Sequence, residues 1–110
     1  MKLIYHQGLT KKQWFSKNIC EQMANVGAEV ERTIKWREKN KKYSRLALER
    51  ALELLNLTIA DLKNKERLKE ICRIKECLLD YFFGTNVYKS TDKFWHRYFY
   101  NFNYAARINL

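Results

Sequence analysis

The apolar residues of this chain recur at helical spacing in four segments. In the first segment they follow steps of three or four residues, which places them on one face of an α-helix. They are Phe15, Ile19, Met23, Val26, Val30 and Ile34. Thr10 is a candidate N-cap, and the cations at 39–42 suit a helix C-terminus. The pattern predicts one continuous helix over residues 11–38.

A second amphipathic segment, rich in alanine and leucine, follows after Ser44, which is a candidate N-cap. The spacing of its leucines predicts a helix over residues 45–57. Thr58 and Asp61 then resemble a capping box and imply a short helical turn after this helix.

The third and fourth segments are separated by a glycine. Asn64 can cap a helix over residues 65–83, and Gly84 lies where a helix C-cap glycine belongs. After a loop, Thr91 opens a helix over residues 92–107.

This last helix contains an aromatic stretch, FWHRYFYNFNYAAR, at residues 94–107. Its spacing places one set of side chains on a single face, and that set comprises Phe94, Trp95, Tyr98, Phe99, Phe102 and Ala106. Most of the aromatic rings are therefore expected in the core. His96, Tyr100 and Tyr104 lie on the flanks, where water can reach them.

Amphipathic helices joined by short links predict an all-α fold, an antiparallel up-down four-helix bundle that forms one domain over residues 1–110. The chain has no proline and only 3 glycines, so the usual turn residues of a β-sandwich are missing. Residues 1–9 are expected to form a short N-terminal arm, or an edge strand through Lys2 to Tyr5. The expected core comprises Phe15, Ile19, Val26, Val30, Leu48, Leu52, Leu55, Leu68, Ile71, Leu78, Phe82, Tyr98, Phe99 and Phe102.

The charge of the chain is strongly positive. Its 22 lysines and arginines outnumber 12 acidic residues and give a net charge of +10, with the excess concentrated in residues 1–44 and 84–110. An acidic partner would therefore meet the N-terminal half or the C-terminal segment.

The apolar runs are far shorter than the roughly 20 residues that span a bilayer, and the N-terminus lacks the apolar region of a signal peptide. We therefore expect a cytoplasmic protein without a membrane partner. The three cysteines lack CxxC spacing, so neither a disulfide framework nor a zinc site is expected.

A cluster of basic and aromatic residues lies where the first predicted helix ends. Single-stranded nucleic acid binders combine phosphate-contacting cations with rings that stack on bases. The candidate binding residues for RNA, DNA or an acidic protein are Lys35, Trp36, Arg37, Lys39, Lys41, Lys42 and Tyr43. Exposed lysines are also ordinary at helix ends, so a solvated terminus without a ligand explains the same pattern.

A second polar set lies near the apolar stripes and comprises Glu29, Arg32, Arg50 and Glu53. Glu29 and Arg50 are expected to form an ion pair that fixes the register of the helices. The functional alternative is a polar core pocket that binds a small ligand. Gly27 costs about 1 kcal/mol of helix propensity relative to alanine, which a closely packed neighbouring helix would explain.

Catalytic signatures are absent from the sequence. Neither His6 nor His96 follows a glutamate by three residues, as a di-iron bundle requires, and no phosphate-binding loop, dinucleotide motif or zinc-protease motif occurs. We therefore expect no catalytic residue, metal or cofactor.

The segment QWFSKNICEQMANVGAEVERTI, the tether with Tyr43 and the segment SRLALERALELL together resemble the opening of HEPN helical-bundle domains. The chain also resembles an uncharacterised prokaryotic family. RNA-cleaving HEPN domains carry an arginine, a spacer of four to six residues and then a histidine near the last helices, usually in a dimer. Neither His6 nor His96 has such an arginine, so the resemblance implies a non-cleaving relative.

The leading functional hypothesis is a non-catalytic interaction module with a basic surface for nucleic acid or an acidic protein. The alternatives are a ligand binder or enzyme with a polar core pocket, and a structural subunit of a two-protein complex of the toxin-antitoxin kind. Because 15% of the residues are aromatic, we also expect a homodimer through the C-terminal or the first helix.

Overall fold

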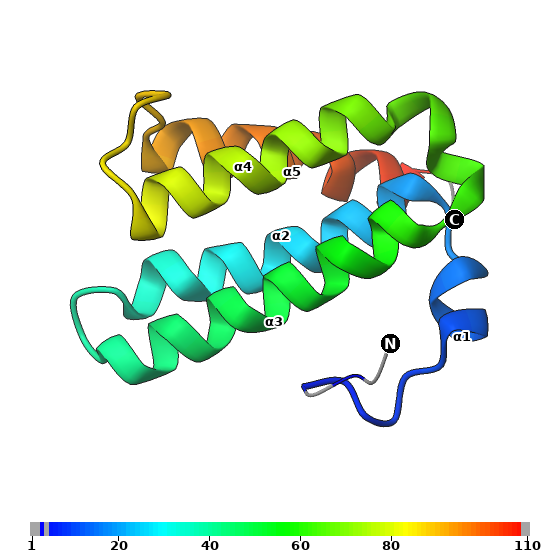
Figure 1. Cartoon of the computed structure of the whole chain (residues 1–110), viewed down its shortest axis with the longest axis horizontal. Helices are drawn as coiled ribbons and strands as arrows, with labels where there is room; N and C mark the ends of the chain where they lie inside the picture. Colours follow the sequence, from blue (N-terminus) through cyan, green and yellow to red (C-terminus); the bar gives the residue numbers. More distant parts are fainter. Residues whose placement is uncertain (1–2, 4, 109–110) are drawn as a thin grey trace.

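The computed structural model describes residues 3 and 5–108, and every regular element among them is helical (Figure 1). The elements are α1 (Lys11–Phe15), α2 (Ile19–Trp36), α3 (Lys41–Ala60), the 3-10 helix η1 (Leu62–Arg67), α4 (Leu68–Phe83) and α5 (Asp92–Ile108). The predicted all-α fold is confirmed. No helix in this described part of the chain combines the length and the apolar character of a membrane span.

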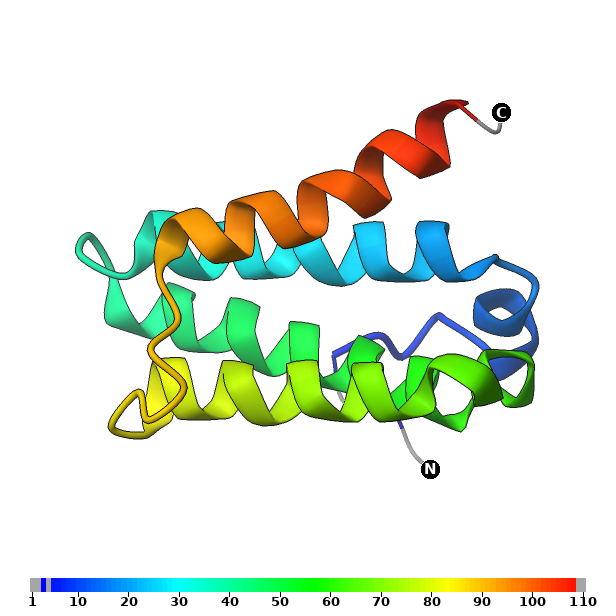
Figure 2. The ribbon, with the colours of Figure 1, turned by 90° about the horizontal axis from the view of Figure 1, so that it is seen from above.

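The helices are arranged in two layers. α2 and α3 form an antiparallel hairpin, and α4 and α5 lie across it as the second layer (Figure 1). Seen from above, α5 runs beside α2, and α4 runs beside α3 (Figure 2). The α2–α3 turn and the α4–α5 loop consequently lie at the same end of the molecule, whereas the C-terminal end of α5 lies at the other.

The continuous first helix predicted over residues 11–38 is wrong, because the chain turns between α1 and α2. Thr10 and Gln13 form a capping box for α1, and the side chain of Asn18 accepts a hydrogen bond from the backbone N–H of Glu21 to start α2. The turn brings the buried Trp14 across the end of α3, where its indole N–H donates to Thr58 Oγ1 at 3.2 Å.

The second predicted helix is longer than residues 45–57. Asn40, rather than Ser44, caps α3, and the Ser44 hydroxyl instead donates to the carbonyl of Thr33 at 2.7 Å. At the other end, Thr58 belongs to α3, and its hydroxyl donates to the carbonyl of Leu54. Thr58 is therefore not part of a capping box with Asp61.

The third predicted helix, residues 65–83, begins with 3-10 geometry. Asp61 caps η1 by accepting from the backbone N–H of Lys63 at 3.1 Å, and α4 follows from Leu68. Gly84 is the C-cap, as predicted. The fourth helix is confirmed, since α5 spans Asp92–Ile108.

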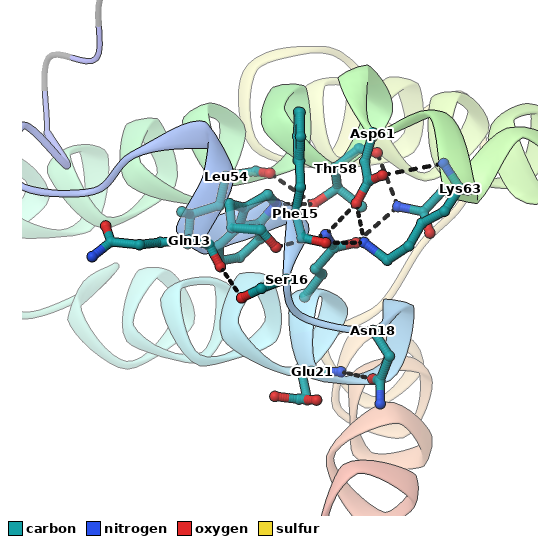
Figure 3. Close-up of polar contacts among 12 residues, drawn as sticks. Gln13, Phe15, Ser16, Asn18, Glu21, Leu54, Thr58, Asp61 and Lys63 are labelled. Carbon is teal, nitrogen blue, oxygen red and sulfur yellow. Dashed lines mark hydrogen bonds and ion pairs between the residues drawn. The ribbon is translucent and has the colours of Figure 1, made fainter.

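A buried polar network closes the end of the molecule at which α1 meets α3 (Figure 3). The Gln22 amide donates to Asp61 Oδ2 at 2.8 Å and to the Trp14 carbonyl at 3.1 Å. The amide of Asn64 donates to Gln22 Oε1 and to the carbonyl of Thr58. Because these buried groups satisfy one another, the network fixes how α1, α2 and η1 meet.

Asp61 is the charged member of this network. Burial acts to raise its pKa, but hydrogen bonds from the Lys63 ammonium and the Gln22 amide outweigh burial and hold the pKa below its ordinary value. Asp61 is therefore a carboxylate in the folded protein at neutral pH.

Large aromatic side chains fill the space between α4 and α5. Trp95 is fully buried and stacks on Phe99, with 6.0 Å between the ring centroids. The Tyr98 hydroxyl donates to Glu70 at 2.8 Å, and burial together with this hydrogen bond raises the pKa of Tyr98. The aromatic face predicted for α5 therefore joins the two helices of the second layer.

The predicted core is correct in its centre and wrong at its edges. Eight of the expected residues are buried, namely Val26, Val30, Leu48, Leu55, Ile71, Leu78, Phe99 and Phe102. A further set is only partly buried, namely Phe15, Ile19, Leu52, Phe82 and Tyr98. Leu68, at the start of α4, is exposed. Trp14 is buried, although it is not among the expected core residues. The edge strand expected at residues 2–5 involves residues 2 and 4, which lie outside the described residues.

Candidate functional site

The turn between α2 and α3 gathers the lysines of the predicted binding cluster. The Asn40 side chain accepts from the Tyr43 backbone N–H at 3.1 Å, and the Asn40 N–H donates to the Trp36 carbonyl at 2.8 Å, so the turn is tight. We call the four exposed lysines around it the basic end, and they are Lys35, Lys39, Lys41 and Lys42.

Two aromatic rings lie among these lysines. Trp36 and Tyr43 meet edge to face with 5.3 Å between their centroids, and Lys35 Nζ lies 5.9 Å from the centre of the Trp36 ring. Tyr43 is 51% exposed and Trp36 is partly buried. The basic end therefore presents both cations and an accessible ring face.

Arg37 differs from its neighbours because it holds the fold together. Its guanidinium donates to both carboxylate oxygens of Asp92, at 3.1 and 2.6 Å, and lies 5.8 Å from the centre of the Tyr81 ring. The Tyr81 hydroxyl donates to the same carboxylate at 2.5 Å. Arg37 lowers the pKa of Asp92, and Asp92 in turn raises the pKa of Arg37. Arg37 thus anchors the end of α2 to the start of α5.

Further cations lie at the same end of the molecule. Arg45, in the first turns of α3, lies 5.8 Å from the centre of the Phe83 ring, at the end of α4. Lys89 and Lys93 belong to the α4–α5 loop and the start of α5, which lie at the same end of the molecule as the α2–α3 turn (Figure 2). The antiparallel order of the helices brings these cations to one end, which the spacing of apolar residues does not reveal by itself.

The acidic groups at this end do not neutralise the lysines. Asp92 is bound to Arg37, and the carboxylate of Asp80 accepts the backbone N–H groups of Val87 and Tyr88 at 2.9 and 3.0 Å. Glu38 is exposed and lies 3.8 Å from Arg37. Within the described part of the chain, these acidic groups form no ion pair with the four lysines of the basic end.

The expected pairing of Glu29 with Arg50 is wrong. Glu29 is buried, but its Oε1 accepts from Arg32, three residues further along α2, and Arg50 is exposed on α3. Glu29 Oε2 has no hydrogen-bond partner among the described residues. The register of α2 and α3 is instead held by uncharged contacts such as that between Ser44 and Thr33.

Glu53, the fourth residue of the predicted polar pocket, binds the N-terminal arm. Its carboxylate accepts the backbone N–H groups of Tyr5 and His6, and His6 Nδ1 lies 2.9 Å from Glu53 Oε1. The structure therefore places Glu29 and Glu53 in separate contacts and does not bring the four predicted residues together in one pocket.

Each histidine lies next to one glutamate: His6 next to Glu53, and His96 next to Glu31. His96 Nδ1 lies 2.6 Å from Glu31 Oε1 at the surface between α2 and α5. The described residues contain no group of three histidine, cysteine, aspartate or glutamate side chains that could hold a metal ion.

Comparisons with protein-family models, with curated proteins and with solved structures each found no match. The resemblance to HEPN domains stays a prediction.

Proposed function

We propose that the chain is a non-catalytic nucleic-acid-binding module that contacts single-stranded RNA or DNA through the basic end. The observation that carries the proposal is that the exposed Lys39, Lys41 and Lys42 lie in the chain between Trp36 and Tyr43, whose rings meet edge to face. Phosphates would bind the ammonium groups, and an unpaired base would stack on the accessible face of Tyr43.

The rings favour nucleic acid over an acidic protein. Lysines alone would attract any polyanion, whereas a base offers a flat π-face to an exposed ring. Tyr43 also lies on the first turn of α3, where the helix N-terminus adds partial positive charge to the lysines.

The scaffold of the proposed site is an antiparallel four-helix bundle made of α2 to α5. In this arrangement the α2–α3 turn projects at one end, and the Arg37–Asp92 contact holds the turn against α5. A rigid support of this kind holds the backbone of the turn in one conformation, so only the side chains are ordered on binding.

The test is a fluorescence-anisotropy titration with labelled single-stranded RNA, single-stranded DNA and duplex DNA, each at low and near-physiological salt. We expect the single strands to bind more tightly than the duplex, with an affinity that falls steeply as salt rises. Replacing Lys39, Lys41 and Lys42 with glutamate should weaken binding on the order of tenfold or more.

A matched control carries the same change of charge at the opposite end of the molecule. Replacing the exposed Lys11, Lys12 and Lys65 with glutamate should weaken binding far less than the change at the basic end. Equal losses in the two variants would show that net charge alone attracts the ligand, which contradicts the proposal. Binding to a polyglutamate peptide as tight as to RNA would also contradict it.

A further inference from the structure

One side of α5 carries an exposed apolar ridge. Tyr100, Tyr104 and Ile108 are spaced four residues apart and are 60%, 54% and 61% exposed. Side chains at this spacing lie on the same side of a helix, and the Tyr100 and Tyr104 rings stack with 6.4 Å between their centroids. The ridge points away from the buried face of α5, which contains Trp95 and Phe99.

A groove runs beside this ridge, between α2 and α5. It has a volume of about 350 Å³, and on the α2 side it is lined by the small residues Ala24, Gly27 and Ala28. On the α5 side it is lined by His96 and Tyr100, so Tyr100 belongs to both the groove and the ridge. A projecting ring and a hollow of small side chains thus lie next to each other on one face.

The groove carries little net charge, unlike the ridge, which the exposed Arg97 and Arg107 flank. The charged groups in the groove are Glu31 and His96, which lie 2.6 Å apart. The net charge of +10 repels a second copy, and the repulsion is strongest where the lysines gather. The ridge reaches the C-terminal end of α5, at the opposite end of the molecule from the basic end (Figure 2).

We propose that the ridge and the groove form the interface between two copies of this chain, related by a two-fold axis. A two-fold interface uses the same patch on both copies, so it needs a projection and a matching hollow on one face. The Tyr100–Tyr104 ridge of each copy would occupy the partner's groove, and tyrosine is enriched in such interfaces. This pairing leaves both basic ends outside the interface.

The test is analytical ultracentrifugation from micromolar to near-millimolar concentrations. We expect a concentration-dependent dimer in the unmodified protein. Tyr104→Lys, on the ridge, and Ala28→Arg, at the exposed edge of the groove, should each raise the dissociation constant at least about tenfold, a typical effect of a central interface residue. Tyr88→Lys is the matched control, because Tyr88 is 51% exposed in the α4–α5 loop at the other end and should leave the dimer unchanged.

Circular dichroism and thermal unfolding of each variant separate a lost interface from a lost fold. A protein that stays monomeric at every concentration overturns the proposal. The placement of the ridge in the groove is overturned if the protein dimerises and both Tyr104→Lys and Ala28→Arg leave the dimer intact. It is also overturned if only one of the two substitutions weakens the dimer.

Discussion

Gly27 of α2 lies directly against Phe99 of α5. A Cβ atom added at Gly27 would lie 2.6 Å from the Cβ of Phe99 and 2.8 Å from its Cγ. The obstacle is the base of the Phe99 side chain, which moves only with the α5 backbone. The close approach of a neighbouring helix predicted from Gly27 is therefore confirmed, and it explains why a glycine is found in the middle of α2.

Gly27→Ala should destabilise the protein although alanine favours a helix. Propensity contributes about 1 kcal/mol in favour of alanine, while overpacking a close helix contact costs about 1–3 kcal/mol. We expect a lower free energy of unfolding in urea and a lower melting temperature. Gly8→Ala is the control, because an added Cβ at Gly8 meets no atom within 4 Å. A more stable Gly27→Ala variant would show that α2 and α5 are less tightly packed.

The Arg37–Asp92 contact should matter for stability more than for binding. Asp92→Asn weakens a two-point ion pair and should lower the free energy of unfolding by about 1 kcal/mol, the upper range for partly exposed pairs. Glu38→Gln, which alters the distant exposed partner of the same arginine, should have almost no effect. Chemical denaturation of both variants compares them directly, and equal stabilities would contradict the anchoring role.

Arg37 and Lys39 should also respond differently to substitution. Arg37→Gln is expected to lower the melting temperature because the anchor to α5 is lost, whereas Lys39→Gln is expected to leave it unchanged because Lys39 is exposed. Nucleic-acid affinity measured on the same two proteins should fall for Lys39→Gln. Loss of stability on changing Lys39 would place it, too, among the structural residues.

Asp61 should make the fold sensitive to acid. Its folded pKa lies below the ordinary value of 3.8, so its carboxylate stabilises the folded state above that value. The contribution is lost as the pH falls through the lower folded pKa. Asp61→Asn should therefore be less stable at neutral pH, by about 1–3 kcal/mol, and the difference should shrink in acid. Urea unfolding of both proteins at a series of pH values measures this, and a difference that persists in acid would mean that charge is not its cause.

Glu53 should control the mobility of the N-terminal arm. Glu53→Ala removes the acceptor for the backbone N–H groups of Tyr5 and His6, so hydrogen exchange at these two amides should accelerate. Exchange in α5 should not change. Glu49→Ala is the control, because among the described residues Glu49 accepts from two side chains, the Tyr5 hydroxyl and Arg45, and from no backbone N–H of the arm. Unchanged exchange at His6 in Glu53→Ala would show that the arm is held by other contacts.

The helical pattern predicted the fold class because apolar spacing reports which side of a segment is buried. The same pattern missed the break between α1 and α2, because Phe15 and Ile19 keep helical spacing across the turn. Asn18 with Glu21 three residues later resembles the start of a helix and is the local signal of the break. What decides the break is the burial of Trp14 against Thr58, a contact 44 residues away in sequence.

The candidate site was predicted in part. The lysines at the α2–α3 turn are close to one another in the sequence, so their clustering can be predicted from the sequence alone. The ion pair between Arg37 and Asp92 joins residues that are 55 positions apart in the sequence. A local sequence pattern therefore does not predict it. The Glu29–Arg50 pair failed for the same reason, since helix rotation decides which charges face one another.

The packing of α5 against α2 has a consequence for how the protein is made. These helices are separated in sequence by α3 and α4, so the surface around Gly27 finds its cover only when Asp92–Ile108 has left the ribosome. During synthesis the α2–α3 hairpin forms first, with that side still open to water. The nascent chain therefore exposes this surface to aggregation and to chaperones until α5 emerges.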